Sequence, residues 1–131
     1  MAQFLIYPGQ TTVHMNSITS VVKVRNRTGR SIHISTDQIL YIEGLSNYSR
    51  IYVDDSVPYL TSLTLKEQQA ILPSFFRISR SYLVNPKRIR QFELRNIHNS
   101  WVEVDNEARL TVSRRKVKEV ANLVAGYQEA K

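Results

Sequence analysis

Short apolar runs separated by polar turns, at intervals of about ten residues, extend along most of this 131-residue chain. Several runs alternate between apolar and polar positions, and such alternation indicates strands with one buried face. Many short strands at this spacing are typical of a mainly β domain of antiparallel sheets. The predicted strands cover residues 21–25, 31–35, 39–43, 50–53, 75–78, 89–94, 101–104 and 110–112.

The polar segments between these runs predict how the strands connect. Residues 26–30 include Gly29 and are expected to close a hairpin between the first two strands. Residues 44–49 form a polar connection between the third and fourth strands, and residues 54–56 indicate a tight turn. Pro58 follows that turn and favours an edge strand, because proline cannot donate a backbone hydrogen bond.

Two helices complete the prediction. Thr64 and Glu67 have the spacing of a capping box, and Pro73 is expected to end the helix that this box begins. Ser113 is expected to cap a last helix, with Arg114, Arg115 and Lys116 in its first turn. Four apolar residues recur on one face of that helix: Val117, Val120, Val124 and Tyr127.

Composition narrows the functional class. The chain has 42% hydrophobic residues, as expected for one globular domain, and 18 Lys and Arg against 11 Asp and Glu, a net charge of +7. This excess favours a polyanionic partner, nucleic acid before an anionic membrane. There is no cysteine, which excludes disulfides, thiol catalysis and Cys-ligated metals. No apolar run approaches the roughly 20 residues of a membrane span, and we expect a cytoplasmic protein without a membrane partner.

The positive charge is concentrated in three stretches. Residues 1–36 contain four cations and no acid, and here a solvated face is an equally good interpretation. Residues 77–95 contain six cations and only Glu93 as an acid, and residues 109–118 contain five cations and no acid. Cations in the first turn of a helix oppose its dipole, whereas a bound phosphate would make them favourable. The cations at 114–116 therefore predict an anion contact.

A second candidate is the polar segment of residues 77–81, which apolar residues flank on both sides. Arg80 is its main candidate for an anion contact, and a salt bridge to Glu43, Glu67 or Glu103 is the structural alternative. The connection at residues 46–50 is a third candidate, for which a plain hairpin loop is the alternative.

Five stretches, in this order and spacing, resemble the LytTR DNA-binding family from about Ser31 to Val124. The most specific of them is Phe76-Arg77-Ile78-Ser79-Arg80-Ser81-Tyr82-Leu83-Val84-Asn85. The others are Gln38-Ile39-Leu40-Tyr41-Ile42-Glu43-Gly44, Asn47-Tyr48-Ser49, Thr64-Leu65-Lys66-Glu67 and Val112-Ser113-Arg114-Arg115.

The resemblance implies a bacterial transcription regulator with elongated antiparallel sheets and two short helices, whose loops enter successive major grooves of duplex DNA. It places the family's contact sites at Ser49, Arg80 and Arg115, and it divides the chain into an N-terminal arm with the first strand (1–30) and a DNA-binding domain (31–131). A second copy on repeated half-sites is a further candidate partner. The full set of predicted DNA-contacting residues is Asn47, Tyr48, Ser49, Arg50, Arg80, Ser81, Lys87, Arg114, Arg115 and Lys116. Arg88 and Lys118 are expected to meet phosphates as well.

Typical members of that family have a receiver domain or membrane segments ahead of this module. Only some thirty residues precede the resemblance here, which leaves a free-standing regulator or an excised module. The initiator Met1 and the lack of a purification tag favour the free-standing regulator.

Two other functions are considered. A single-stranded nucleic-acid binder could stack bases on the seven tyrosines, four phenylalanines and Trp101. An enzyme is disfavoured, because His14, His33 and His98 match no metal or triad spacing and there is no glycine-rich phosphate loop. We predict no cofactor, no metal and no small-molecule substrate.

Overall fold

Ten strands and two helices make up the described part of the chain, which in this computed structural model comprises residues 21–25, 28–54, 56–96 and 98–130. The predicted arm at residues 1–20 lies outside it. The strands are β1 Val21–Arg25, β2 Ser31–Ser35, β3 Ile39–Leu45, β4 Tyr48–Val53, β5 Tyr59–Thr61, β6 Phe76–Arg77, β7 Tyr82–Val84, β8 Ile89–Glu93, β9 Trp101–Val104 and β10 Arg109–Thr111. The helices are α1 Leu65–Ile71 and α2 Val117–Ala130, with 3-10 turns η2 Thr36–Gln38, η3 Pro86–Arg88 and η4 Arg114–Lys116.

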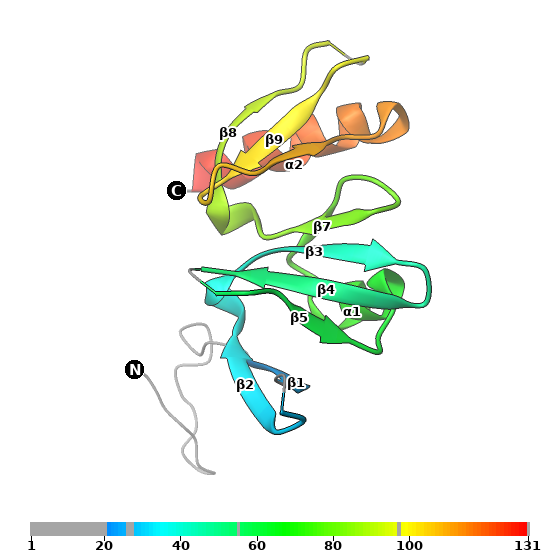
Figure 1. Cartoon of the computed structure of the whole chain (residues 1–131). Helices are drawn as coiled ribbons and strands as arrows, with labels where there is room; N and C mark the ends of the chain where they lie inside the picture. The colour runs from blue at the N-terminus through cyan, green and yellow to red at the C-terminus, as the bar shows by residue number, and fades with distance from the viewer. Residues whose placement is uncertain (1–20, 26–27, 55, 97, 131) are drawn as a thin grey trace.

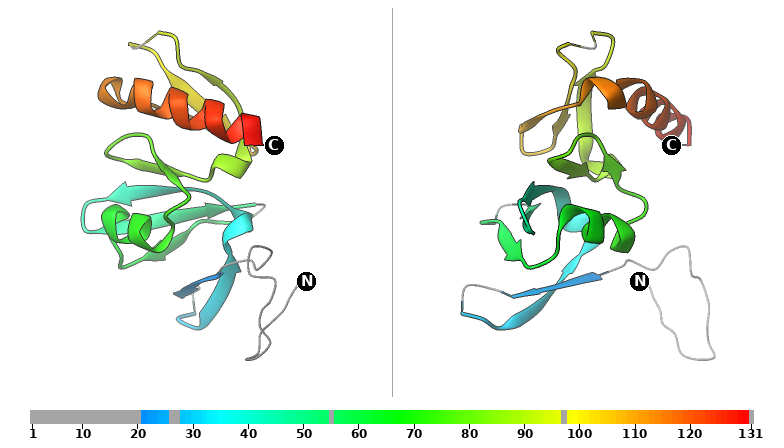
Figure 2. Two further views of the ribbon diagram at one scale, coloured as in Figure 1. Left: turned by 180° about the vertical axis from the view of Figure 1, so that it is seen from behind. Right: turned by 90° about the vertical axis from the view of Figure 1, so that its right-hand side faces the viewer.

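The strands form three antiparallel sheets that are stacked along an elongated molecule (Figure 1). A five-stranded sheet in the order β5-β4-β3-β7-β6 lies in the middle. A three-stranded sheet, β10-β9-β8, lies with α2 at one end, and the β1–β2 hairpin lies at the other (Figures 1 and 2). The predicted mainly β architecture with two helices is confirmed.

Two hydrophobic cores hold the layers together, one on each side of the middle sheet. Leu40 and Val84 of the middle sheet are fully buried against Val102 of β9 and Val120 of α2. On the other side, Ile42 belongs to a core that includes β1, β2 and α1. Because β1 pairs with all five residues of β2 and its valines are buried in this core, the first strand is part of the folded unit.

The sequence features that predicted the start and end of α1 and the apolar face of α2 are present in the structure. Thr64 Oγ1 accepts from the Glu67 amide at 3.2 Å, and Glu67 Oε1 accepts from the Thr64 amide at 2.8 Å, which is the predicted capping box. Helix α1 ends at Ile71, two residues before Pro73. The predicted apolar face of α2 is buried at Val117, Val120 and Val124.

Three predicted boundaries are wrong. Strands β3 and β4 continue to the pair Leu45–Tyr48, so the polar connection is only a turn of Ser46 and Asn47, with Ser46 at φ 61°. The predicted strand at residues 75–78 is reduced to β6, because it pairs only at its centre with β7, a strand that was not predicted. Residues 114–116 form η4, a 3-10 turn ahead of α2, and the Ser113 side chain makes no capping hydrogen bond.

Candidate nucleic-acid interface

Three polar segments lie on the same side of the molecule, at the right in Figure 1 and facing the viewer in the right-hand view of Figure 2. They are the β3–β4 turn with the first residue of β4 (residues 46–48), the β6–β7 loop (residues 78–81) and η4, Arg114–Lys116. We call them the three-segment surface. They match the three candidate stretches of the sequence in place, although not in every residue.

Backbone hydrogen bonds join the three segments. The amide of Gly44, two residues before the β3–β4 turn, donates to the Ser81 carbonyl at 2.8 Å. The amide of Ser113, just before η4, donates to the Ile78 carbonyl at 2.9 Å. The β6–β7 loop is therefore held between its two neighbours, and the relative positions of the segments are fixed by main-chain contacts.

Arg77 shapes the β6–β7 loop from within. Its Nε donates to the Ser79 carbonyl at 2.8 Å and its Nη2 to the Arg80 carbonyl at 3.1 Å. Burial lowers the pKa of Arg77, but an arginine stays charged at neutral pH. The Ser81 amide adds a bond to Ser79 Oγ at 3.1 Å. Arg77 thus supports the loop, which leaves Arg80 as its outward cation.

Arg80 is exposed, and no carboxylate of the described residues forms an ion pair with it. Each acid considered as a partner is engaged elsewhere. Glu43 pairs with Arg50 at 3.3 Å, and Glu103 with Arg109 at 2.9 Å. Glu67 completes the capping box of α1. The salt-bridge alternative for Arg80 is therefore not observed.

An open hollow of about 260 Å³ joins the second and third segments. Four of its lining side chains are cationic, and none of the described lining residues is acidic. Gln69 of α1 also contributes, and the sequence offered no signal for it because α1 and the loop meet only in the tertiary structure. The lining residues are Gln69, Arg77, Ser79, Arg80, Ser113, Arg115 and Lys116. This concentration of donors suits an anion.

The three cations of η4 differ in exposure and in ion pairing. Arg114 and Arg115 are exposed, and neither is paired with a carboxylate of the described chain. Lys116 is one-third exposed and pairs with Glu119 at 3.2 Å. The Lys116 amide donates to the Ser113 carbonyl at 2.8 Å, so the turn is closed by backbone and not by the predicted side-chain cap.

Ser49 does not lie on the three-segment surface. Its side chain is fully buried, and its Oγ donates to the Leu63 carbonyl at 2.8 Å. Because Ser49 lies in β4 and not in a loop, alternation along the strand turns it towards α1, where it accepts from Gln68 Nε2 at 3.3 Å. This burial does not fit the direct DNA contact that the family resemblance implied. Exposed Asn47 and Tyr48 are the residues of this segment that can meet a ligand.

Arg50 is the other residue of the predicted segment that has an internal partner. Its Nη1 lies 3.3 Å from Glu43 Oε1 and 3.2 Å from the Tyr52 hydroxyl. Hydrogen bonding to Tyr52 and the charge of Glu43 raise the pKa of Arg50. The charge of Arg50 is thus largely balanced within β3 and β4.

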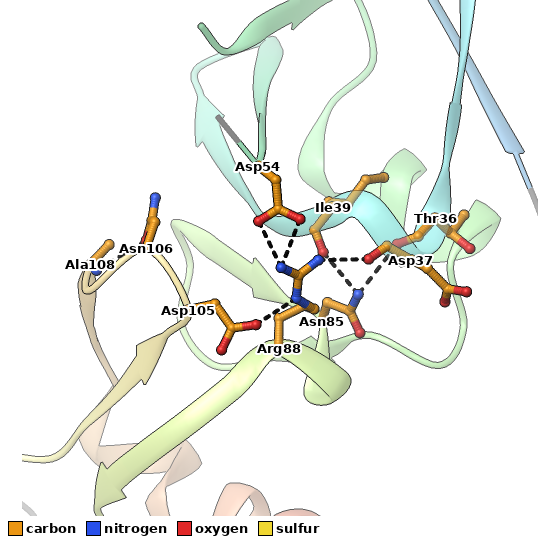
Figure 3. Close-up of polar contacts among 9 residues, drawn as sticks. All are labelled: Thr36, Asp37, Ile39, Asp54, Asn85, Arg88, Asp105, Asn106 and Ala108. Carbon is orange, nitrogen blue, oxygen red and sulfur yellow. Dashed lines mark hydrogen bonds and ion pairs between the residues drawn. The ribbon is translucent and has the colours of Figure 1, made fainter. Parts of the chain in front are cut away.

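Lys87 and Arg88 lie at the opposite end of the middle sheet. They follow β7 near the first residues of β3, where Asn85 Nδ2 donates to the Ile39 carbonyl at 2.8 Å. Lys87 pairs with Asp37 at 3.1 Å. Arg88 bonds both carboxylate oxygens of Asp54 at 2.7 Å (Figure 3). The structure does not bring these two cations to the three-segment surface.

Exposed aromatic rings are few in the described residues. The rings of Tyr41 and Tyr52 stack on each other with their centroids 4.3 Å apart. The Arg109 guanidinium carbon lies 3.8 Å from the centroid of the Trp101 ring and covers it. Tyr48 and Phe92 are the aromatic residues of the described chain that count as exposed. The described surface therefore has no continuous platform on which successive bases could stack.

The described residues give no sign of a metal centre, since they contain no group of three or more His, Asp or Glu side chains that could hold a metal ion. None of the helices among them is long and apolar enough to cross a membrane.

The antiparallel layers present a cationic surface built from two connections and a turn before a helix, and the family match assigns this fold to a class of DNA-binding β domains. The sequence matches the LytTr DNA-binding domain over residues 29–125, and the chain belongs to this family, whose members are DNA-binding domains of transcription regulators. A solved LytTr DNA-binding domain of a putative methyl-accepting/DNA response regulator from Bacillus cereus has the same fold, with a TM-score of 0.71 at 22% identity. The similarity covers 80% of this chain and 96% of that one. The comparison with curated proteins found no match to the chain.

Proposed function

We propose that this chain regulates transcription by binding specific sequences of duplex DNA through the three-segment surface. The observation that supports this most is the position of Arg80 and Arg115, which line one hollow whose described lining residues include no acid. Two guanidinium groups that line one hollow, on segments joined by backbone hydrogen bonds, suit the acceptor groups of base pairs in a major groove.

The residues of the surface divide into two roles in this proposal. Arg80 and Arg115 contact base edges, where a bidentate Arg–guanine pair gives about 1–3 kcal/mol of discrimination. Arg114 and Lys116 meet phosphates, which adds affinity and salt dependence but little sequence information. Asn47, Tyr48 and Ser81 are exposed, and their amide and hydroxyl groups can donate hydrogen bonds to sugar and phosphate oxygens. Lys87, Arg50 and Ser49 are not assigned a contact.

The test is selection of binding sites from a random duplex pool, followed by competition binding with Arg80→Ala and Arg115→Ala. Each variant is expected to lose roughly 5- to 150-fold in affinity for the selected site and to relax the base preference at its own position. Repeated half-sites in the selected sequences, with complexes of two chains, would support binding by a second copy.

Arg95→Ala is a matched control, because the Arg95 side chain is 92% exposed, lies on the β8–β9 connection beside Ala121 and Ala125 of α2, and does not line the cationic hollow. It is expected to bind the selected site as the wild type does. Wild-type affinity and base preference in both Arg80→Ala and Arg115→Ala would refute the assigned contacts. Preference for single-stranded over duplex probes would refute the duplex proposal itself.

A further inference from the structure

A second groove lies between the β1–β2 hairpin and β5, and it reaches Thr61, which pairs with Ser49 beside the first segment of the three-segment surface. It consists of two open hollows, of about 560 Å³ and 380 Å³, that meet where Arg25 and Leu60 line both. None of the residues that line it belongs to the cationic hollow of the three-segment surface. A ligand in this groove would therefore leave Arg80 and Arg115 accessible.

The groove is apolar on the side of β5. Val57 and Leu60 are 61% and 56% exposed, and Pro58 lies between them in the sequence. Apolar side chains this exposed and this close together are typical of a surface that a partner covers.

The side of the groove formed by β1 is cationic. Lys23 and Arg25 alternate with buried valines and point outward, and neither is in an ion pair with a carboxylate of the described chain. Arg25 Nη1 donates to the Gly29 carbonyl at 2.9 Å, which holds its guanidinium beside the hairpin. No acidic residue is found among the described residues that line the groove.

Strands β5 and β1 form the two sides of the groove. Strand β5 is the terminal strand of the five-stranded sheet and pairs only with β4, and β1 lies close to it without backbone pairing. A peptide in the groove would therefore be recognised by the side chains of both strands.

We propose that this groove binds an extended segment of another protein in which acidic residues alternate with apolar ones. The apolar side chains pack on Val57 and Leu60, and the carboxylates meet Lys23 and Arg25. A second copy of this chain fits less well, because two chains of net charge +7 would bring these cations together. A nucleic-acid backbone would satisfy the cations but leave the exposed apolar side chains without a partner.

The test begins with the full chain and a random octapeptide library displayed on phage. The enriched peptides are expected to alternate Asp or Glu with apolar residues. A labelled synthetic copy of the most enriched peptide is then titrated with each variant by fluorescence polarisation. We expect Leu60→Asn and Arg25→Glu each to weaken binding at least tenfold, and both residues are exposed.

Ile71→Asn and Lys66→Glu are the matched controls, since both residues are exposed on α1 and neither lines the groove. They are expected to bind the peptide as the wild type does. The proposal would be overturned if no peptide were enriched or if the enriched peptides lacked acidic residues. Equal binding of the peptide by the groove variants and their controls would overturn it as well. Displacement of the peptide by a random duplex would also overturn it, since the groove would then belong to a nucleic-acid interface. No step of this test depends on specific DNA binding, so it can fail or succeed independently of the proposed function.

Discussion

The hydroxyl of Ser49 connects β4, β5 and the start of α1. Its Oγ lies 2.9 Å from Thr61 Oγ1, donates to the Leu63 carbonyl and accepts from Gln68 Nε2. Both Ser49 and Gln68 are fully buried, so no water replaces a lost partner. The role of Ser49 is therefore to fix the strand behind the β3–β4 turn, and its effect on a ligand is indirect.

Ser49→Ala is expected to lower the free energy of unfolding by about 1–3 kcal/mol, because it leaves buried polar partners without a hydrogen bond. Urea denaturation measures this, and Ser81→Ala is the control, since the Ser81 side chain is exposed. The folded variant should keep the affinity of the wild type for a selected site. Unchanged stability with weakened DNA binding would instead return Ser49 to the contact surface.

The elements show which features could be predicted from the sequence. The capping box of α1 and the apolar face of α2 depend on residues within a few positions of each other, and both were predicted. Strand β7 was not, because its three residues become a strand by pairing with the short strand β6 and with β3, some forty positions earlier. The turn at Ser46 was too long in the prediction, since a positive φ is uncommon for serine.

The candidate site divides in the same way. Apolar residues on both sides of a cationic segment pointed to Arg80, and cations at a helix start pointed to residues 114–116. The family resemblance then singled out Arg115, and the contacts of both arginines stay predictions. The burial of Ser49, the pairing of Arg50 with Glu43 and the distance of Lys87 from the surface all depend on contacts between strands. Such contacts leave no local pattern in the sequence.

One carboxylate, that of Glu103, forms ion pairs with two arginines on the outer face of the three-stranded sheet. The Glu103 side chain is 7% exposed and bonds Arg109 at 2.9 Å and Arg90 at 3.1 Å. Hydrogen bonds from Arg109 and Gln91 lower the pKa of Glu103 below its ordinary value of 4.5. A lowered folded-state pKa stabilises the folded protein at neutral pH, and this contribution is lost as the pH falls from 4.5 through the lowered value.

Glu103→Gln is thus expected to be less stable than the wild type at pH 7 and to lose less stability on acidification. Unfolding midpoints measured from neutral pH to below 4.5 test this. Glu119→Gln is the control, because its ion pair with Lys116 is open to solvent, and its pH profile should follow that of the wild type. Parallel profiles for Glu103→Gln and the wild type would contradict the assigned role of the ion pairs.

At the scale of the whole molecule, the three-segment surface is shared between layers. Its first two segments belong to the middle sheet, whereas η4 precedes the helix that covers the three-stranded sheet. One core extends from Leu40 of the middle sheet to Val120 of α2, so packing sets the distance between Arg80 and Arg115. If this surface binds DNA as proposed, the spacing of its contacts is therefore a property of the layer stack and not of any single loop.

Arg88 holds the same layers together at the end opposite the three-segment surface. Its guanidinium bonds Asp54 after β4, Asp105 after β9 and the Asp37 carbonyl of η2, all within 2.8 Å (Figure 3). Its side chain is 18% exposed and its two carboxylate partners are 45% exposed. The contribution to stability is consequently smaller than the roughly 3–5 kcal/mol of a fully buried pair.

Arg88→Ala is expected to lower the free energy of unfolding by about 1–2 kcal/mol, and Arg88→Lys to recover little of this, because one ammonium cannot bridge three partners in a plane. Arg95→Ala, at an ion pair exposed to solvent, should have almost no effect.

DNA binding separates this structural role from the phosphate contact predicted for Arg88. If Arg88 only holds the layers, the folded Arg88→Ala variant keeps the wild-type dependence of log affinity on log salt for a selected site. A slope reduced by about 0.9 would mean that one phosphate contact has been lost and that Arg88 reaches the DNA after all.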